Sequence, residues 1–308
     1  MRQCFPSSVI RILIIGMLTL TGCQVSRVVS EPILPSVTLS KTPVQPTPTT
    51  EAVSPSGTAT SAPSPTPIPP TLTPSLTPTP TWVYNEPGKV VAPILLYHHV
   101  NGENTDSRYR VSIPDFREQM SALHEQGYTA ITITMLVEAL IQGRDLPVKP
   151  VVITFDDGHI SVYEHAFPIM NEFGFPGVFY IVANRIKNVN DFVDVEQITD
   201  MVNAGWEIGS HGYTHLDITK NHDSAPYEIG QSKLDLQTAL GININTFAYP
   251  YGEVNPFVAQ QVSDYAYRAG MGLGTSIIHT YSTLFYLNRI EIQGDYTLEQ
   301  FIEMVNKE

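Results

Sequence analysis

Cysteine is scarce in this sequence, and both cysteines lie close to its start. Cys4 and Cys23 are the only two among 308 residues, so disulfides or thiolate metal clusters cannot hold the rest of the chain together. A metal site beyond residue 23 must therefore be built from His, Asp or Glu.

Basic residues are also few, at 17 Lys and Arg against 30 Asp and Glu, which gives a net charge of -13. No basic patch offsets this charge, and a chain of this kind repels phosphate backbones and anionic lipid headgroups, so we expect no nucleic-acid partner. The content of 42% hydrophobic and 9% aromatic residues is sufficient for a sizeable core. A wholly disordered or fibrous protein is excluded.

A long apolar run is missing from the first segment as well. Arg2 and Arg11 precede a run from Ile12 to Leu20, which is shorter than the roughly 20 residues that a membrane-spanning helix needs. Residues 1–22 therefore fit a cleaved signal peptide. Leu20-Thr21-Gly22-Cys23 resembles the bacterial lipobox, which implies an acylated Cys23, membrane anchoring and an extracytoplasmic domain. An ordinary secretory peptide with an incidental cysteine is the alternative.

The segment 23–82 is rich in proline, threonine and serine. From Glu31 to Trp82 there are 14 prolines among 52 residues, and proline fixes φ and removes backbone donors, so no packed core forms there. We expect a semi-extended spacer that lifts the following domain away from the membrane, or a disordered connector.

Residues 83–308 form the predicted catalytic domain, which we expect to be soluble and monomeric. Short apolar runs predict strands, and helices fit between them: one is capped by Ser112, one ends at Gly241 and one begins near Thr297 with Gln300 three residues later. Repeated strand–helix units predict an α/β fold with a parallel sheet or barrel, whose chemistry lies at the carboxyl ends of the strands. The runs read as strands are Ile94–Leu96, Val151–Phe155, Val178–Val182, Trp206–Ile208 and Thr246–Tyr249.

Two of these strand ends carry residues suited to binding a metal. Asp156 and Asp157 follow the Val151–Phe155 run, and adjacent carboxylates repel one another unless a cation or proton relieves them. His211 and His215 follow the Trp206–Ile208 run at a spacing that allows both imidazoles to reach one cation. Each pair alone is also typical of a turn or of an exposed helix face. Together they favour a site with two His and one Asp.

Two further strand ends are candidates. Phe247-Ala248-Tyr249-Pro250-Tyr251-Gly252 is either an aromatic core strand or a groove wall that stacks a sugar ring and offers a backbone N–H. His98 and His99 close the first strand, and side-chain alternation predicts that only one of them points into a barrel.

Thr154-Phe155-Asp156-Asp157-Gly158 with Ser210-His211 and His215 resembles the polysaccharide deacetylase family, carbohydrate esterase family 4, over nearly all of residues 90–305. The resemblance implies an irregular (β/α) barrel and metal-dependent removal of acetyl groups from sugars. It also implies Asp156 as catalytic base, Asp157, His211 and His215 as metal ligands, and the backbone N–H of Tyr251 as an oxyanion donor.

The sequence departs from the family pattern twice. Ala248 stands where the family often has an arginine, and the only late histidine that could fit a Leu-x-His motif is His279, preceded by isoleucines. Leu96-Tyr97-His98 supplies that motif at the start of the domain instead, as in circularly permuted relatives that include biofilm-glycan deacetylases. Arg289 then replaces the missing arginine beside Asp156, or else forms a surface salt bridge.

These residues predict a deacetylase that acts on an N-acetylated extracellular or cell-wall polysaccharide. We expect Zn²⁺, with Co²⁺ or Ni²⁺ equally suited to the ligands, Asp156 as base and protonated His98 as general acid. The alternatives are an O-acetyl esterase and an inactive, wall-tethered glycan-binding lipoprotein.

Overall fold

The structure is a computed structural model that describes residues 80–102, 107–186 and 190–307. The predicted signal peptide 1–22, the predicted acylation site Cys23 and the predicted tether up to residue 79 lie outside the described residues. The first strand, β1, begins at Trp82.

A sheet of parallel strands forms the centre of this domain. Its order is β12-β11-β10-β9-β8-β3-β14, with β6 also paired to β8. The predicted α/β fold on parallel strands is confirmed. The strands are β3 (Ile94–Tyr97), β6 (Thr129–Ala130), β8 (Pro150–Phe155), β9 (Val178–Ile181), β10 (Glu207–Ser210), β11 (Thr246–Ala248), β12 (Ala269–Met271) and β14 (Ile290–Glu291).

The two ends of this sheet approach each other through the chain that precedes β14. Residues 284–289 hydrogen-bond to β12 and to the residues just after it, through Gly270 N to Leu284 O, Gly272 N to Leu287 O and Gly274 N to Arg289 O. Strand β3 comes early in the chain but lies between β14 and β8. The first and last parallel strands are therefore neighbours, and this is the arrangement that the early position of His98 requires.

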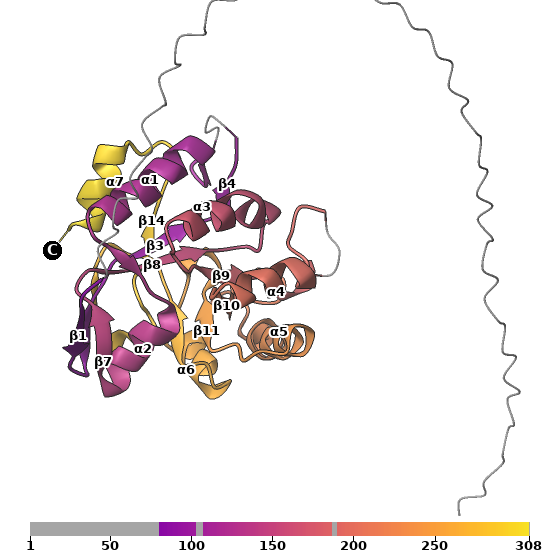
Figure 1. Ribbon diagram of the computed structural model, residues 1–308. Helices are drawn as coiled ribbons and strands as arrows, with labels where there is room; N and C mark the ends of the chain where they lie inside the picture. The colour runs from indigo at the N-terminus through magenta and orange to yellow at the C-terminus, as the bar shows by residue number, and fades with distance from the viewer. Residues whose placement is uncertain (1–79, 103–106, 187–189, 308) are drawn as a thin grey trace, which may run out of the picture. The chain divides into compact units, whose positions relative to one another are not determined.

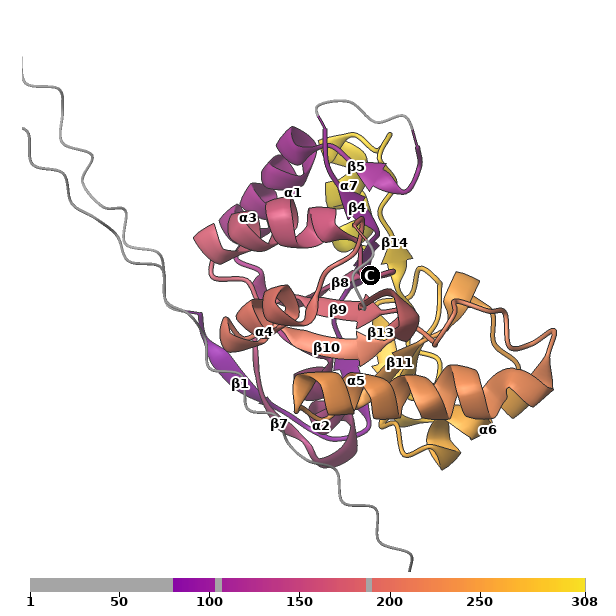
Figure 2. The same cartoon turned by 90° about the vertical axis from the view of Figure 1, so that its right-hand side faces the viewer.

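Helices cover the outer face of these strands, as Figure 1 shows. In Figure 2 the strands β8, β9, β10 and β11 follow one another, and α3, α4 and α5 succeed one another beside them. The caps predicted at Ser112, Gly241 and Thr297 are all present. The helices are α1 (Ile113–Glu125), α2 (Ile133–Gln142), α3 (Phe167–Glu172), α4 (Val195–Asn203), α5 (Ser232–Leu240), α6 (Pro256–Asp264) and α7 (Leu298–Val305).

Three short strand pairs lie outside the main sheet. Two are antiparallel: β1 (Trp82–Asn85) with β7 (Arg144–Pro147), and β2 (Lys89–Val91) with β13 (Ile278–Thr280). The third, β4 (His99–Val100) with β5 (Arg110–Val111), is parallel and follows directly on β3. Over the described ranges, no helix has the length and apolar character needed to cross a membrane.

Side-chain alternation along β8 determines the face of the sheet on which Asp156 lies. All six residues of β8 are buried, as expected for a strand covered on both faces. Val151, Ile153 and Phe155 pack in the core cluster shared with helices α1, α3 and α4, whereas Val152 packs in the other cluster. Continuing this period of two residues turns Asp156 to the same side as Val152, into the interior of the sheet's curve.

Candidate active site

The carboxyl ends of the parallel strands meet around one cavity of about 400 Å³. Every site residue predicted from the sequence contributes to its lining, because parallel strands deliver their ends to the same edge of a sheet. The lining residues are Leu96, His98, His99, Arg108, Tyr109, Asp156, Asp157, His211, His215, Tyr251, Gly252, Leu273, Arg289 and Glu291.

Asp157, His211 and His215 form a cluster suited to a metal ion. One ligand atom from each residue lies within 4.8 Å of the others, and His215 Nε2 is 3.4 Å from Asp157 Oδ1. Two imidazole nitrogens and one carboxylate oxygen are a donor set that suits Zn²⁺ and other first-row divalent ions. The residues present therefore fit the metal that the family resemblance implies.

Hydrogen bonding and burial prepare the two histidines to ligate. Nδ1 of His211 donates to the carbonyl of Ala248 at 2.9 Å, and this bond leaves Nε2 unprotonated and turned into the cavity in the neutral ring. Burial, together with the charge of His211, lowers the pKa of His215 to about 4, which favours its neutral form. Ala248, at the position of the missing arginine, thus contributes through its backbone carbonyl.

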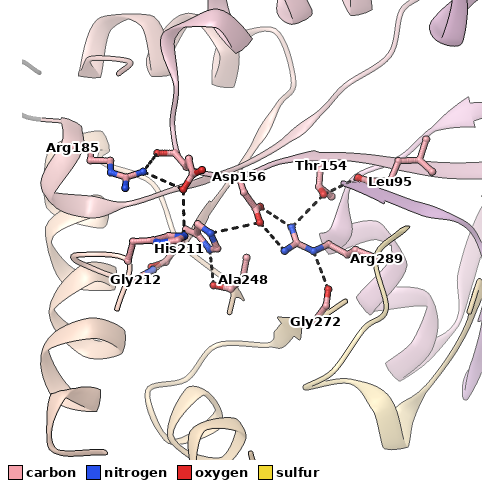
Figure 3. A network of polar contacts seen from close by, with 12 residues as sticks. Leu95, Thr154, Asp156, Arg185, His211, Gly212, Ala248, Gly272 and Arg289 are labelled. Atoms are coloured by element: carbon pink, nitrogen blue, oxygen red, sulfur yellow. Dashed lines mark hydrogen bonds and ion pairs between the residues drawn. The ribbon is translucent and has the colours of Figure 1, made fainter. Parts of the chain in front are cut away.

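Asp156 lies beside this cluster and is paired with Arg289. Arg289 donates from its two terminal nitrogens to the two oxygens of Asp156 at 2.7 and 2.8 Å, and both side chains are almost fully buried. Figure 3 shows this fork, with Arg289 also bonded to Gly272 O and close to Thr154. Burial alone raises the pKa of Asp156, but the charge of Arg289, followed by that of His211, outweighs it and lowers the pKa to about 2.

The burial of Arg289 shows whether it is a partner of Asp156 or part of a surface salt bridge. Its side chain is 1% exposed and its guanidinium lies 5.4 Å from the ring of Tyr180, so it forms no surface salt bridge. It reaches Asp156 from the chain just before β14. The arginine is therefore present beside the aspartate although Ala248 occupies the usual position in the sequence.

Backbone strain is concentrated at this site. Outside glycine, the described residues with positive φ are Asp157 (76°), His215 (69°), Tyr251 (61°) and Ala266 (58°). The first three line the cavity. Such conformations are costly for residues with a Cβ and persist where the surrounding structure imposes them, often at functional sites. The observed strain supports a functional role for this cluster.

Both His98 and His99 contribute to the cavity lining, and the ring of His99 also contacts that of His159 at a centroid distance of 4.3 Å. The expectation that only one of the two points inward stays a prediction. Strand β3 ends at Tyr97 and β4 begins at His99, and alternation does not carry across that break. Burial lowers the pKa of His98 against the opposing charges of Asp156 and Asp157, which favours neutral imidazole over the protonated form expected from the sequence.

His279, the weaker candidate for the late histidine, lies elsewhere. It is fully buried in β13 and its Nε2 bonds to the carbonyl of Ala92 at 3.0 Å. It does not line the cavity among the described residues.

Tyr251 forms an exposed wall of the cavity. Its side chain is 62% exposed, and its ring contacts that of His215 edge to face at a centroid distance of 4.5 Å. The short turn Pro250–Gly252 that follows β11 carries it. The aromatic face is available to a ligand that enters the cavity.

Two residues that contact the site were not predicted from the sequence. Buried Glu228 accepts hydrogen bonds from the backbone N–H groups of Tyr213 and Thr214, both at 2.9 Å, and so holds the loop between His211 and His215. Arg185 donates to Asp157. Neither residue belongs to a recognisable motif, and only the long-range contacts show their place.

Comparison with known proteins agrees with this geometry. Residues 143–270 match the sequence model of the polysaccharide deacetylase family. The poly-beta-1,6-N-acetyl-D-glucosamine N-deacetylase of Escherichia coli K12 is 28% identical over 255 residues, which cover 68% of this chain but only 38% of that protein.

Two solved structures share the fold. The Streptococcus pyogenes deacetylase PplD, in complex with acetate, superimposes with a TM-score of 0.64 at 23% identity and covers 70% of this chain and 99% of its own. IcaB from Ammonifex degensii gives a TM-score of 0.60 at 24% identity, covering 71% and 98%. The predicted barrel type and the family resemblance are confirmed: the fold is that of the solved deacetylases, and residues 143–270 match the polysaccharide deacetylase family.

Proposed function

We propose that this protein is a metal-dependent hydrolase that removes acetyl groups from the N-acetylated sugars of an extracellular or cell-wall polysaccharide. The observation that carries the proposal is the joint presence, in one cavity, of the Asp157–His211–His215 cluster and of a separate carboxylate, Asp156. A ligand cluster alone would suit a structural metal, whereas a carboxylate beside it that is not a ligand provides the general base that hydrolysis requires.

Asp157, His211 and His215 would hold the divalent ion. When bound, such an ion supplies Lewis acidity, which polarises an acetyl carbonyl and lowers the pKa of water. Tyr251 and His98 line the same cavity without belonging to this ligand set. Zn²⁺ is our first choice, and Co²⁺ or Ni²⁺ suits the same donors.

Asp156 would act as the general base. The Arg289 fork holds its carboxylate in place and ionised, since its pKa is about 2. The carboxylate is therefore deprotonated before reaction, as a general base must be, and its Oδ2 lies 3.6 Å from His211 Nε2, at the edge of the ligand cluster. The position suits a group that deprotonates a nucleophile arriving at the cluster.

His98 and Tyr251 would complete the chemistry. The lowered pKa of His98 favours its neutral ring before reaction, and His98 would take up the proton that Asp156 removes from the nucleophile and donate it to the departing sugar nitrogen. The backbone N–H of Tyr251 would stabilise the oxyanion, and its exposed ring offers a stacking face to a sugar.

The printed name of the E. coli relative, a poly-beta-1,6-N-acetyl-D-glucosamine N-deacetylase, supports an N-acetylglucosamine polymer as substrate. This chain covers 38% of that relative's length, so the substrate is inferred for the shared domain. The acidic composition suits a neutral polymer that becomes cationic on deacetylation and disfavours an anionic one.

Acetate release distinguishes this proposal from its alternatives. The purified protein should release acetate from N-acetylglucosamine oligomers, and a chelator should abolish the release. Release from acetylxylan alone would identify an O-acetyl esterase instead. Binding to the oligomers without release from either substrate, with or without added Zn²⁺, would identify a glycan-binding protein that has lost turnover.

We also propose the organisation of the whole chain: a signal peptide at 1–22, a tether at 23–82 and the catalytic domain at 83–308. The Leu-Thr-Gly-Cys sequence supports lipid attachment at Cys23, and the 14 prolines between Glu31 and Trp82 support an extended spacer. The protein would then be a bacterial lipoprotein whose monomeric catalytic domain faces the extracytoplasmic side.

A further inference from the structure

Arg185 contacts the aspartate of the candidate metal cluster from outside the cavity lining. Its Nη1 donates to Asp157 Oδ1 at 3.1 Å and to the Asp157 carbonyl at 3.3 Å. Its guanidinium lies over the ring of Phe192 at 4.6 Å, which limits the directions it can take. The residue belongs to the short helical turn Ala183–Ile186 that follows β9.

The two contacts act on the strained part of the site. Asp157 has φ of 76°, and the bond to its carbonyl holds the backbone in that conformation. The bond to Oδ1 directs the carboxylate, because the same oxygen lies 3.4 Å from His215 Nε2. Arg185 therefore fixes the oxygen that faces the other ligands of the cluster.

Each aspartate of the pair thus has its own arginine. Arg289 serves Asp156 and is 1% exposed, whereas the Arg185 side chain, 27% exposed, serves Asp157. Figure 3 shows the two guanidinium groups at opposite ends of one polar network, with Asp156 and His211 between them. The two adjacent carboxylates therefore accept hydrogen bonds from different guanidinium groups.

The two arginine–aspartate pairs differ in their effect on a bound metal ion. Arg289 neutralises a carboxylate outside the ligand cluster, but Arg185 shares a carboxylate inside it. A divalent ion bound by Asp157 would have to share that carboxylate with a second cation. Like charges this close oppose each other even when solvent screens them.

We propose that Arg185 lowers the affinity of the site for a divalent cation, because its positive charge shares the carboxylate of Asp157 with that cation. The inference rests on the proposed function, since it assumes that the cluster binds such an ion. A unit charge opposing a divalent ion at this range, with water-like screening, corresponds to a change in affinity of about tenfold.

The test measures the dissociation constant for Zn²⁺ of the purified full-length protein by competition with a chromophoric chelator. Arg185→Met and Arg185→Gln remove the charge and should bind Zn²⁺ about tenfold more tightly. Arg185→Lys keeps the charge and should stay close to the unmodified protein. Arg117→Met, which breaks an exposed ion pair with Glu172 elsewhere, is the matched control and should change nothing.

The direction of the change separates this role from mere damage to the fold. Loss of structure can only weaken metal binding, so tighter binding by Arg185→Met and Arg185→Gln supports the proposal. Equal or weaker binding in both variants, with unfolding temperatures of the chelated proteins within a few degrees of the unmodified protein, overturns it. Should Met and Gln both unfold, weaker binding by Arg185→Lys overturns it too. If the unmodified protein binds no divalent ion, the proposed function fails first.

Discussion

Replacing Arg289 with methionine removes the charge of the buried fork while leaving a side chain of similar length. In the structure both oxygens of Asp156 accept hydrogen bonds from Arg289, and the two side chains are 1% and 3% exposed. Removing one partner of a buried pair leaves an uncompensated charge, which typically costs about 3 to 5 kcal/mol. We expect a loss of folding stability of that size at neutral pH.

The pKa of Asp156 determines how this stability depends on pH. A shift from 3.8 to about 2 corresponds to roughly 2 kcal/mol of stability. Because the pKa is lowered in the fold, this contribution is present above the unfolded value and is lost as the pH falls toward 2. Without Arg289, burial raises the pKa of Asp156, and the carboxyl then takes up a proton on mild acidification. The loss of folding stability caused by Arg289→Met should therefore be smaller at pH 4.5 than at pH 7.

Urea unfolding in the presence of a chelator measures these differences without a contribution from bound metal. The double variant Asp156→Asn/Arg289→Met should regain most of the stability lost by Arg289→Met, because it leaves no buried charge. A coupling energy below about 1 kcal/mol in this double-mutant cycle, or a deficit that does not change with pH, would refute the buried-pair reasoning.

The other predictions address the assigned roles in turn. Asp157→Asn should lower the Zn²⁺ bound per chain, whereas Asp156→Asn should retain Zn²⁺ and lose about 10² to 10⁴ in turnover; equal metal loss in both would contradict the division between ligand and base. His98→Ala should lose N-deacetylation by a similar factor and keep some hydrolysis of an activated aryl acetate, while His99→Ala should be mild; the reverse order would show that the acid was misassigned. Cys23→Ala should move the protein from the membrane fraction to the soluble fraction, and its retention with the membrane would count against the lipid anchor.

Local patterns were sufficient to predict the elements that carry the site. Continuous apolar runs mark β8 and its neighbours because such strands are covered on both faces, and the caps at Ser112 and Thr297 mark helix starts because their side chains accept from backbone N–H groups. The paired aspartates and the two histidines could be located because each pair directly follows a recognisable strand.

Contacts between distant segments could not be predicted in the same way. Arg185 lies 28 residues from Asp157 and Glu228 lies 14 from Thr214, and neither has a local pattern that distinguishes it from a surface charge. Alternation could not assign the directions of His98 and His99, because it holds only within a continuous strand and β3 ends before β4 begins. The position of Arg289 beside Asp156, 133 residues away, depends on β14 lying next to β3.

Metal titration of the chelated protein tests the central claim most directly. In the proposed mechanism Asp157, His211 and His215 bind one divalent ion, and acetate release depends on that ion. Zn²⁺ added to the chelated protein should restore acetate release from N-acetylglucosamine oligomers in proportion to bound metal, with saturation at about one ion per chain. Undiminished acetate release after complete removal of metal would contradict the account.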